Sequence, residues 1–240
     1  MFGLILIMIY EAFYGSSGQA QPIAFAQVVS YVWLGQALLA LLPWNVDTEL
    51  RAMARSGAVA YELCRPVDLY CFWFARGLAW RLAPALLRSI PLSLLAIFVL
   101  PWIGLGEWRL QFPSLSAGLA FGAAMVGTLL LGCAISTFLN ITLLWTVSND
   151  GAYVVLTALV SMFSGLIVPL PLFPGWAQSI LMAMPFAGLA DLPYRLYTGN
   201  IDAGTTPLIL LHQLIWTAII VVAGRWMLRR GMSRVVVQGG

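Results

Sequence analysis

Residues 47–88 decide how this chain is organised, and they read DTELRAMARSGAVAYELCRPVDLYCFWFARGLAWRLAPALLR. They form the one long polar interruption in an otherwise apolar sequence. Six of the twelve basic residues lie in it: Arg51, Arg55, Arg65, Arg76, Arg81 and Arg88. Charged side chains are costly in hydrocarbon, and arginine collects on the cytoplasmic side of a membrane. The sequence therefore predicts that this segment lies at the cytoplasmic face.

Local signals within the segment predict a folded knob, which we define as residues 51–68. The apolar spacing from Leu50 to Ala54 favours a helical turn with one apolar side, and Gly57 suits its C-cap. A second helix is expected to start at Pro66, because proline suits the first helical turn. Asp68 just after it complements the positive end of the helix dipole.

Composition identifies the broad class of the protein. Of its 240 residues, 61% are hydrophobic and only 9% are charged, and the mean hydropathy is +0.92. An ordinary soluble domain is about a quarter charged, so an integral membrane protein is predicted. The arginines fit a basic rim facing the membrane better than a nucleic-acid site. The chain has no lysine, so it lacks the residue that a P-loop ATPase needs and is not expected to be an enzyme.

Hydropathy predicts an all-α membrane protein with six transmembrane helices in one domain, residues 1–240. A spanning helix needs about 20 apolar residues. A coupling segment, residues 47–85, includes an interfacial helix that turns into the membrane near Pro84. Residues 169–192 are apolar but broken by prolines, which favours extracellular re-entrant helices between spans five and six. The expected spans are approximately residues 1–14, 23–42, 86–102, 115–145, 152–168 and 207–228.

The distribution of arginines sets the predicted orientation. Ten fall on the assigned cytoplasmic side, and only Arg109 and Arg195 fall outside. Both termini are therefore expected to be cytoplasmic, in a bacterial plasma membrane. Asp191, like Arg195, is expected at the outer surface.

Candidate chemistry within the spans is sparse. Ser164 and His212 could form the dyad of an intramembrane serine hydrolase, although Met162 replaces the glycine that such enzymes carry two positions before the serine. An ATP-independent secondary transporter is a further alternative, but it usually needs carboxylates at membrane depth, and only Glu11 qualifies. One histidine and scattered carboxylates offer no metal-ligand spacing, so no metal site is predicted.

Two motifs carry a resemblance to a known family. The first runs from Ser56 to Asp68 in the pattern Ser-Gly-x-x-Ala-Tyr-x-Leu-x-Arg-Pro-Val-Asp. The second is Phe-Ser-Gly-Leu-Ile-Val-Pro-Leu-Pro-Leu-Phe-Pro from residue 163, followed by Met-Pro-Phe at residue 184. From about Ala24 onward, the chain resembles permease subunits of the type-2 ATP-binding-cassette (ABC-2) exporters, in the six-span branch with a separate ATPase.

The resemblance implies a permease that pairs with a second six-span permease, a different chain being favoured over an identical one. Two ATPase subunits would dock beneath the pair and bind ATP and Mg, so no cofactor is expected on this chain. Membrane lipid is the other expected partner, and nucleic acid is not. The residues expected to couple to the ATPase are Arg51, Arg55, Gly57, Tyr61, Leu63, Arg65, Pro66 and Asp68.

The substrate is expected to pass between the two permeases, with the proline-rich outer helices as a gate. Polar groups at membrane depth more often join helices than touch substrate, and both roles remain open for Asn140, Ser161 and Ser164. The residues assigned to the substrate pathway and gate are Asn140, Ser161, Ser164, Pro169, Pro174, Pro185 and Phe186.

Overall fold

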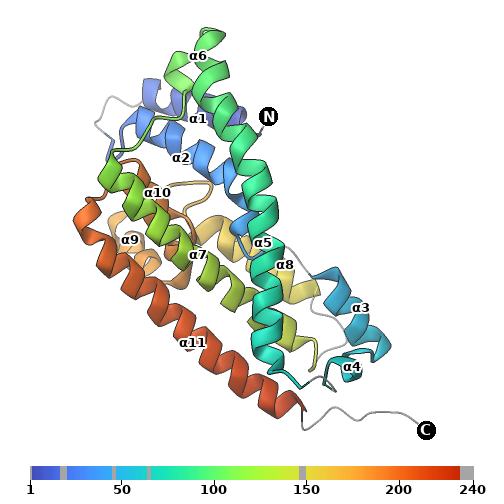
Figure 1. Ribbon diagram of the computed structural model, residues 1–240. Coiled ribbons are helices and arrows are strands. Elements are labelled where there is room, and N and C mark those ends of the chain that lie inside the picture. Colours follow the sequence, from blue (N-terminus) through green and yellow to red (C-terminus); the bar gives the residue numbers. More distant parts are fainter. Residues whose placement is uncertain (1, 17–20, 45–46, 64–65, 146–149, 233–240) are drawn as a thin grey trace.

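A computed structural model describes residues 2–16, 21–44, 47–63, 66–145 and 150–232, and every regular element in these ranges is a helix (Figure 1). The α-helices are α1 (Phe2–Ser16), α2 (Phe25–Ala37), α3 (Thr48–Ser56), α4 (Val59–Leu63), α5 (Leu69–Leu94), α6 (Leu100–Trp102), α7 (Leu115–Thr142), α8 (Asp150–Phe163), α9 (Gly175–Ala183), α10 (Asp191–Tyr197) and α11 (Thr206–Met232). A π-helical turn, η2 (Leu95–Val99), and five 3₁₀ turns complete them: η1 (Leu39–Leu41), η3 (Gly106–Trp108), η4 (Leu170–Leu172), η5 (Pro185–Leu189) and η6 (Ala203–Thr205).

Three long helical segments form the frame of the molecule. They are Leu69–Trp102, Leu115–Thr142 and Ala203–Met232, with 34, 28 and 30 residues, and each is long and apolar enough to cross a membrane. At about 1.5 Å per residue all three exceed the roughly 30 Å of a bilayer core. Figure 1 shows α5, α7 and α11 running along the long axis, with α7 packed against both neighbours. Two more apolar helices, Phe2–Ser16 and Gly151–Phe163, are shorter, so the count of six spans stays a prediction.

The expected change of direction near Pro84 is wrong. α5 runs without a break through Pro84 and Pro91 and continues through η2 into α6. Proline inside a helix removes one backbone hydrogen bond, but membrane helices tolerate it where local adjustments satisfy the freed groups. The separate interfacial helix and the third span therefore form one continuous rod.

The segment between α8 and α11 is built from short helices, as expected for residues 169–192. α8 ends at Phe163, five residues before the predicted end of the fifth span. Gly165 then adopts φ +80°, a left-handed conformation that favours glycine. η4, α9, η5 and α10 follow, and α10 and η5 pack on α7. Their depth in a membrane remains a prediction.

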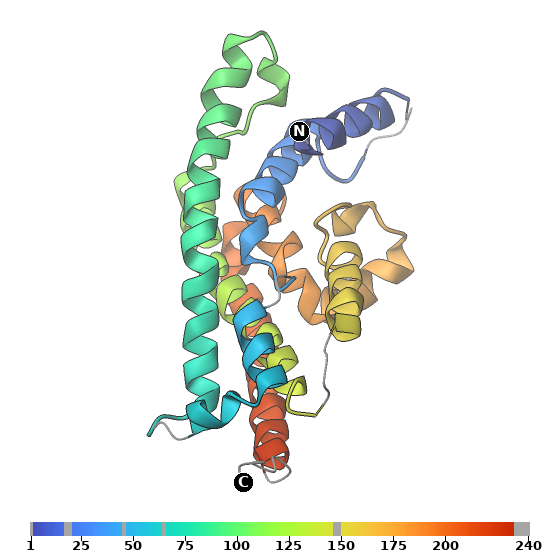
Figure 2. The same ribbon diagram turned by 90° about the vertical axis from the view of Figure 1, so that its right-hand side faces the viewer.

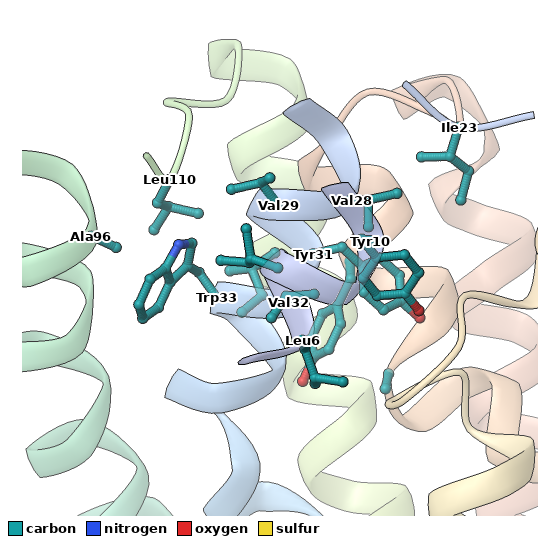
Figure 3. Close-up of a cluster of buried hydrophobic side chains, with 14 of the residues drawn as sticks. Leu6, Tyr10, Ile23, Val28, Val29, Tyr31, Val32, Trp33, Ala96 and Leu110 are labelled. Carbon is teal, nitrogen blue, oxygen red and sulfur yellow. The ribbon is translucent and has the colours of Figure 1, made fainter. Parts of the chain in front are cut away.

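The largest buried cluster in the described chain joins α1 and α2 to η2, α6 and α10, and Figure 3 shows part of it. Val28, Val29 and Tyr31 of α2 are nearly inaccessible to solvent. The indole nitrogen of Trp33 donates to the carbonyl of Trp108 at 2.8 Å, which fastens α2 to η3. The cluster thus lies at the opposite end of the long helices from α3, α4 and the end of α11 (Figures 1 and 2).

Candidate coupling surface and buried polar groups

The first knob helix, α3, has a defined cap at each end. The carboxylate of Asp47 accepts hydrogen bonds from the backbone nitrogens of Glu49 and Leu50, at 3.1 and 3.0 Å, so it is the N-cap. At the other end Gly57 has φ +76°, as its predicted C-cap role requires. A second short helix that the sequence reasoning missed, α4, follows at once.

The knob helices are fastened to the frame by apolar packing. Leu50 of α3 and Val59 of α4 are both buried. They join a cluster contributed by the near ends of the three long helices, which consists of Leu69, Tyr70, Trp73, Ile141 and Leu228. The knob is therefore seated on α5, α7 and α11 together.

Charged groups reinforce this seat. Arg76 of α5 donates through Nε to Asp47 at 2.8 Å and through Nη2 to Glu49 at 2.5 Å. The indole nitrogen of Trp73 donates to the carboxylate of Glu62 in α4 at 2.6 Å. Hydrogen bonds to charged groups are among the stronger ones, so both knob helices are tied to α5 by polar contacts as well.

The second predicted helix begins at Leu69 rather than at Pro66. Asp68 is its N-cap and accepts a hydrogen bond from the backbone nitrogen of Cys71 at 2.8 Å. This bond favours the ionised carboxylate and lowers the pKa of Asp68 below its usual value. Arg225 of α11 lies 3.8 Å from the same carboxylate, so the start of α5 also meets α11.

The outward side of the knob carries apolar groups. Tyr61 is 80% exposed and Val67 is 53% exposed, and Pro66, directly before Val67, is also exposed. A cluster of exposed apolar groups beside charges is typical of a protein-binding surface. Of the other residues assigned to coupling, the side chains of Arg55 and Leu63 and the whole of Arg65 lie outside the described part of the chain.

Two residues from different predicted sets meet in one cavity. Arg51 of the knob and Ser161 of α8 line a cavity of about 510 Å³. Tyr153 lies on the same wall and donates its hydroxyl to the side-chain oxygen of Asn140 at 2.8 Å. Asn140 thus joins α7 to α8, which is the helix-linking role that the sequence left open. The hydroxyl of Ser161 donates to the carbonyl of Thr157 at 2.7 Å, one turn earlier in α8.

The residues assigned to the gate are dispersed. Pro169 is buried, whereas Pro174 is exposed at the start of α9. Pro185 and Phe186 instead line an apolar cavity of about 490 Å³ between α7, α8 and α11. Of the residues assigned to the gate, only Pro185 and Phe186 therefore line a common cavity. Their neighbours there are residues of α7, α8 and α11, not Pro169 or Pro174.

The proposed dyad receives no geometric support. The hydroxyl oxygen of Ser164 accepts a hydrogen bond from the backbone nitrogen of Leu166 at 3.3 Å. Both ring nitrogens of His212 are buried without a hydrogen-bond partner in the described part of the chain. The two side chains are thus not hydrogen-bonded to each other, which a nucleophile and its base require. Within the same residues, no cluster of three or more His, Cys, Asp or Glu could hold a metal.

Asp191, which is expected on the outer side of the membrane, is fully buried within the protein. Its carboxylate accepts from the hydroxyl of Tyr31 at 3.0 Å and from the backbone nitrogen of Leu170 at 2.9 Å. Arg195 lies one helical turn away and pairs with it at 3.3 Å. Glu11, the one carboxylate expected at membrane depth, is exposed at the surface of α1.

Arg81 is a second buried charge whose position the sequence reasoning missed. Only 6% of it is exposed, and its guanidinium donates to the hydroxyl of Ser136 in α7. The pattern of arginines along α5 gave no signal for this, because Arg76 and Arg88 look equivalent to it in sequence. Only the packing of α5 on α7 distinguishes the three.

Comparison with known proteins identifies the family. Residues 3–239 match the family described as ABC-2 family transporter protein. No curated protein and no solved structure matches the chain significantly. The family match spans nearly the whole sequence, including the knob and the short helices before α11, and the chain belongs to the ABC-2 transporter family of membrane proteins.

Proposed function

We propose that this chain is the permease subunit of an ATP-driven exporter, coupled through the knob to a separate ATPase dimer and paired with a second six-span permease. The chain supplies no ATPase site of its own, and ATP and Mg bind to the partner. Knob, coupling segment and C-terminus then lie on the cytoplasmic side of a bacterial plasma membrane. This proposal extends the family membership, which by itself implies only a permease.

One observation carries the proposal: the knob presents exposed apolar groups outward while its inner side is seated on three long helices. Tyr61 and Val67 point to a partner, and Leu50 and Val59 fasten the same short helices to the frame. Since buried contacts and ion pairs join the knob to α5, we expect a movement of the knob to displace the end of α5. A loop that is only solvated would not need buried contacts and ion pairs with the long helices.

The transmission route follows from named contacts. Arg76 holds Asp47 and Glu49 at the start of α3, and Trp73 holds Glu62 in α4. Arg51 of α3 and Ser161 of α8 line the same cavity. Movement of α3 therefore displaces a wall of this cavity, which is how closure of the ATPase dimer would change access to a substrate path.

The proposal is tested by copurification and ATP hydrolysis. The chain is co-expressed with candidate P-loop ATPases and purified in mild detergent, and vanadate-sensitive hydrolysis is measured. Tyr61→Ala removes the most exposed aromatic ring of the knob, and its loss should weaken capture of the ATPase by about tenfold or more. Arg65→Ala should uncouple or detach the ATPase as well.

A matched control is available at the opposite end of the molecule. Phe112 is 73% exposed, so Phe112→Ala removes a comparable apolar ring without touching the knob. It should leave capture and hydrolysis unchanged. Normal capture and coupled hydrolysis in both knob variants would make the coupling role wrong, as would a chain that retains no ATPase at all.

A further inference from the structure

The guanidinium of Arg81 is buried where α5 packs on α7. Its partners are all uncharged: the hydroxyl of Ser136, the carbonyl of Gly77 at 3.4 Å and the sulfur of Cys133 at 3.9 Å. A guanidinium keeps its charge and has five N–H donors, which suit carboxylate or phosphate oxygens. These neighbours accept hydrogen bonds from some of the N–H donors, but none of them neutralises the positive charge.

Other arginines of the described chain show what Arg81 lacks. Arg76, Arg195 and Arg225 each lie within 4 Å of a carboxylate, whereas no described carboxylate pairs with Arg81. The Nε atom of Arg81 is also buried without a hydrogen-bond partner among these residues. A buried charge without a counter-charge is strongly unfavourable, so the site is incomplete as the described residues form it.

A groove adjoins this charge. It has a volume of about 440 Å³ and is lined by Ala40, Leu42, Ala79, Trp80, Arg81, Ala83 and Pro84. Arg81 itself is part of this lining. A Cβ built on Gly132 of α7 would stand 3.9 Å from Nε and 3.0 Å from the carbonyl oxygen of Leu41, so the unpaired nitrogen lies near the segment that contains Leu41. Leu41 lies between two of the residues that form the groove wall. The groove thus offers an anion a route to Arg81.

The groove lies beside the exposed side of α5 rather than in the protein interior. Trp80 is 50% exposed, and Leu87, one turn after Ala83 on the same stripe of α5, is 76% exposed. Arg81 lies twelve residues into a 34-residue segment, so about 18 Å along a rod of about 51 Å. If that rod is centred on a core of roughly 30 Å, Arg81 lies only about 8 Å below the interface. A lipid phosphate can approach an arginine at that depth.

We propose that this groove binds an anionic phospholipid of the bilayer, with the phosphate at Arg81 and an acyl chain along Ala83 and Leu87. The lipid supplies the counter-charge that the described chain lacks, and its tail covers exposed apolar side chains of α5. This site goes beyond the proposed export function and does not depend on the ATPase.

Native mass spectrometry of the purified full chain tests the proposal. The probes are phosphatidylglycerol, which is anionic, and phosphatidylcholine with the same acyl chains. Wild-type protein should retain phosphatidylglycerol about tenfold more tightly, and Arg81→Gln should lose this preference. Arg109→Gln, which changes an exposed arginine directly after η3, should keep it. Absence of a preference in the wild-type protein would overturn the proposal.

A second variant protects the test against misfolding of Arg81→Gln. Ala83→Phe fills the groove from its exposed wall and leaves the bond between Arg81 and Ser136 in place. It should lose phosphatidylglycerol while retaining the wild-type melting temperature, and retention of the lipid in this variant would overturn the proposal.

In the complex with the ATPase, the lipid should stay bound during turnover. Release in step with ATP hydrolysis would instead identify transported cargo and refute a resident lipid.

Discussion

At the scale of the residue, Asp191 of α10 connects α2 and η4 to its own helix through one carboxylate. The hydroxyl of Tyr31 in α2 donates to Asp191 and to the carbonyl of Gly165. The other partners of the Asp191 carboxylate are the backbone nitrogen of Leu170 and the side chain of Arg195.

Asp191→Ala should lower the free energy of unfolding by about 3 kcal/mol, because it removes one partner of a buried ion pair. Unfolding in detergent with increasing SDS measures this. Glu107→Ala, at an exposed carboxylate, should change it by less than about 0.5 kcal/mol, and equal effects of the two substitutions would contradict the role of the buried pair.

The same residue shows why the charged sites were predicted unevenly. The caps at Asp47 and Gly57 depend on neighbours within a few positions, so local sequence determines them. Gly57 was predicted as a cap for this reason. Asp191 is buried by a tyrosine 160 positions away, and Arg81 by a serine 55 positions away. No local pattern contains those contacts, so both charges were assigned by polarity alone.

At the scale of the element, α7 and α11 approach closely because of one glycine. A Cβ at Gly127 of α7 would lie 1.9 Å from the side-chain oxygen of Gln213, which is fully buried. Gln213 cannot easily move, since its amide donates to the carbonyls of Ala124 at 3.0 Å and Gly188 at 2.8 Å. Gly127→Ala should therefore cost about 2 kcal/mol of stability by overpacking, measured by the same unfolding assay.

A second glycine of α7 provides the control. Nothing lies within 4 Å of a Cβ at Gly122, so Gly122→Ala should be neutral or stabilising by up to about 1 kcal/mol through helix propensity. Adding Gln213→Ala to Gly127→Ala should relieve part of the strain. If the two glycine variants are equally stable, the close approach at Gly127 is not what holds α7 against α11.

Element boundaries were predicted best where one apolar run is bounded by polar residues. The predicted spans 115–145 and 207–228 overlap α7 and α11 almost fully. The prediction was wrong for α5, where Pro84 suggested a change of direction but the helix continues through it. α8 also ends early, because Gly165 turns the chain towards Asp191.

At the scale of the whole molecule, the two ends of the long helices should lie on opposite sides of the membrane. Tyr61 is exposed at the knob end and Phe112 at the other. In a background with the three native cysteines replaced by serine, Tyr61→Cys and Phe112→Cys each offer one thiol to a membrane-impermeant maleimide. The excess of arginine at the knob end predicts that Phe112→Cys is labelled in intact cells, whereas Tyr61→Cys is labelled only in inverted vesicles. Labelling of both thiols from one side would show that Tyr61 and Phe112 do not lie on opposite sides of the bilayer. The reversed pattern would place the knob outside the cell, where no ATPase could reach it.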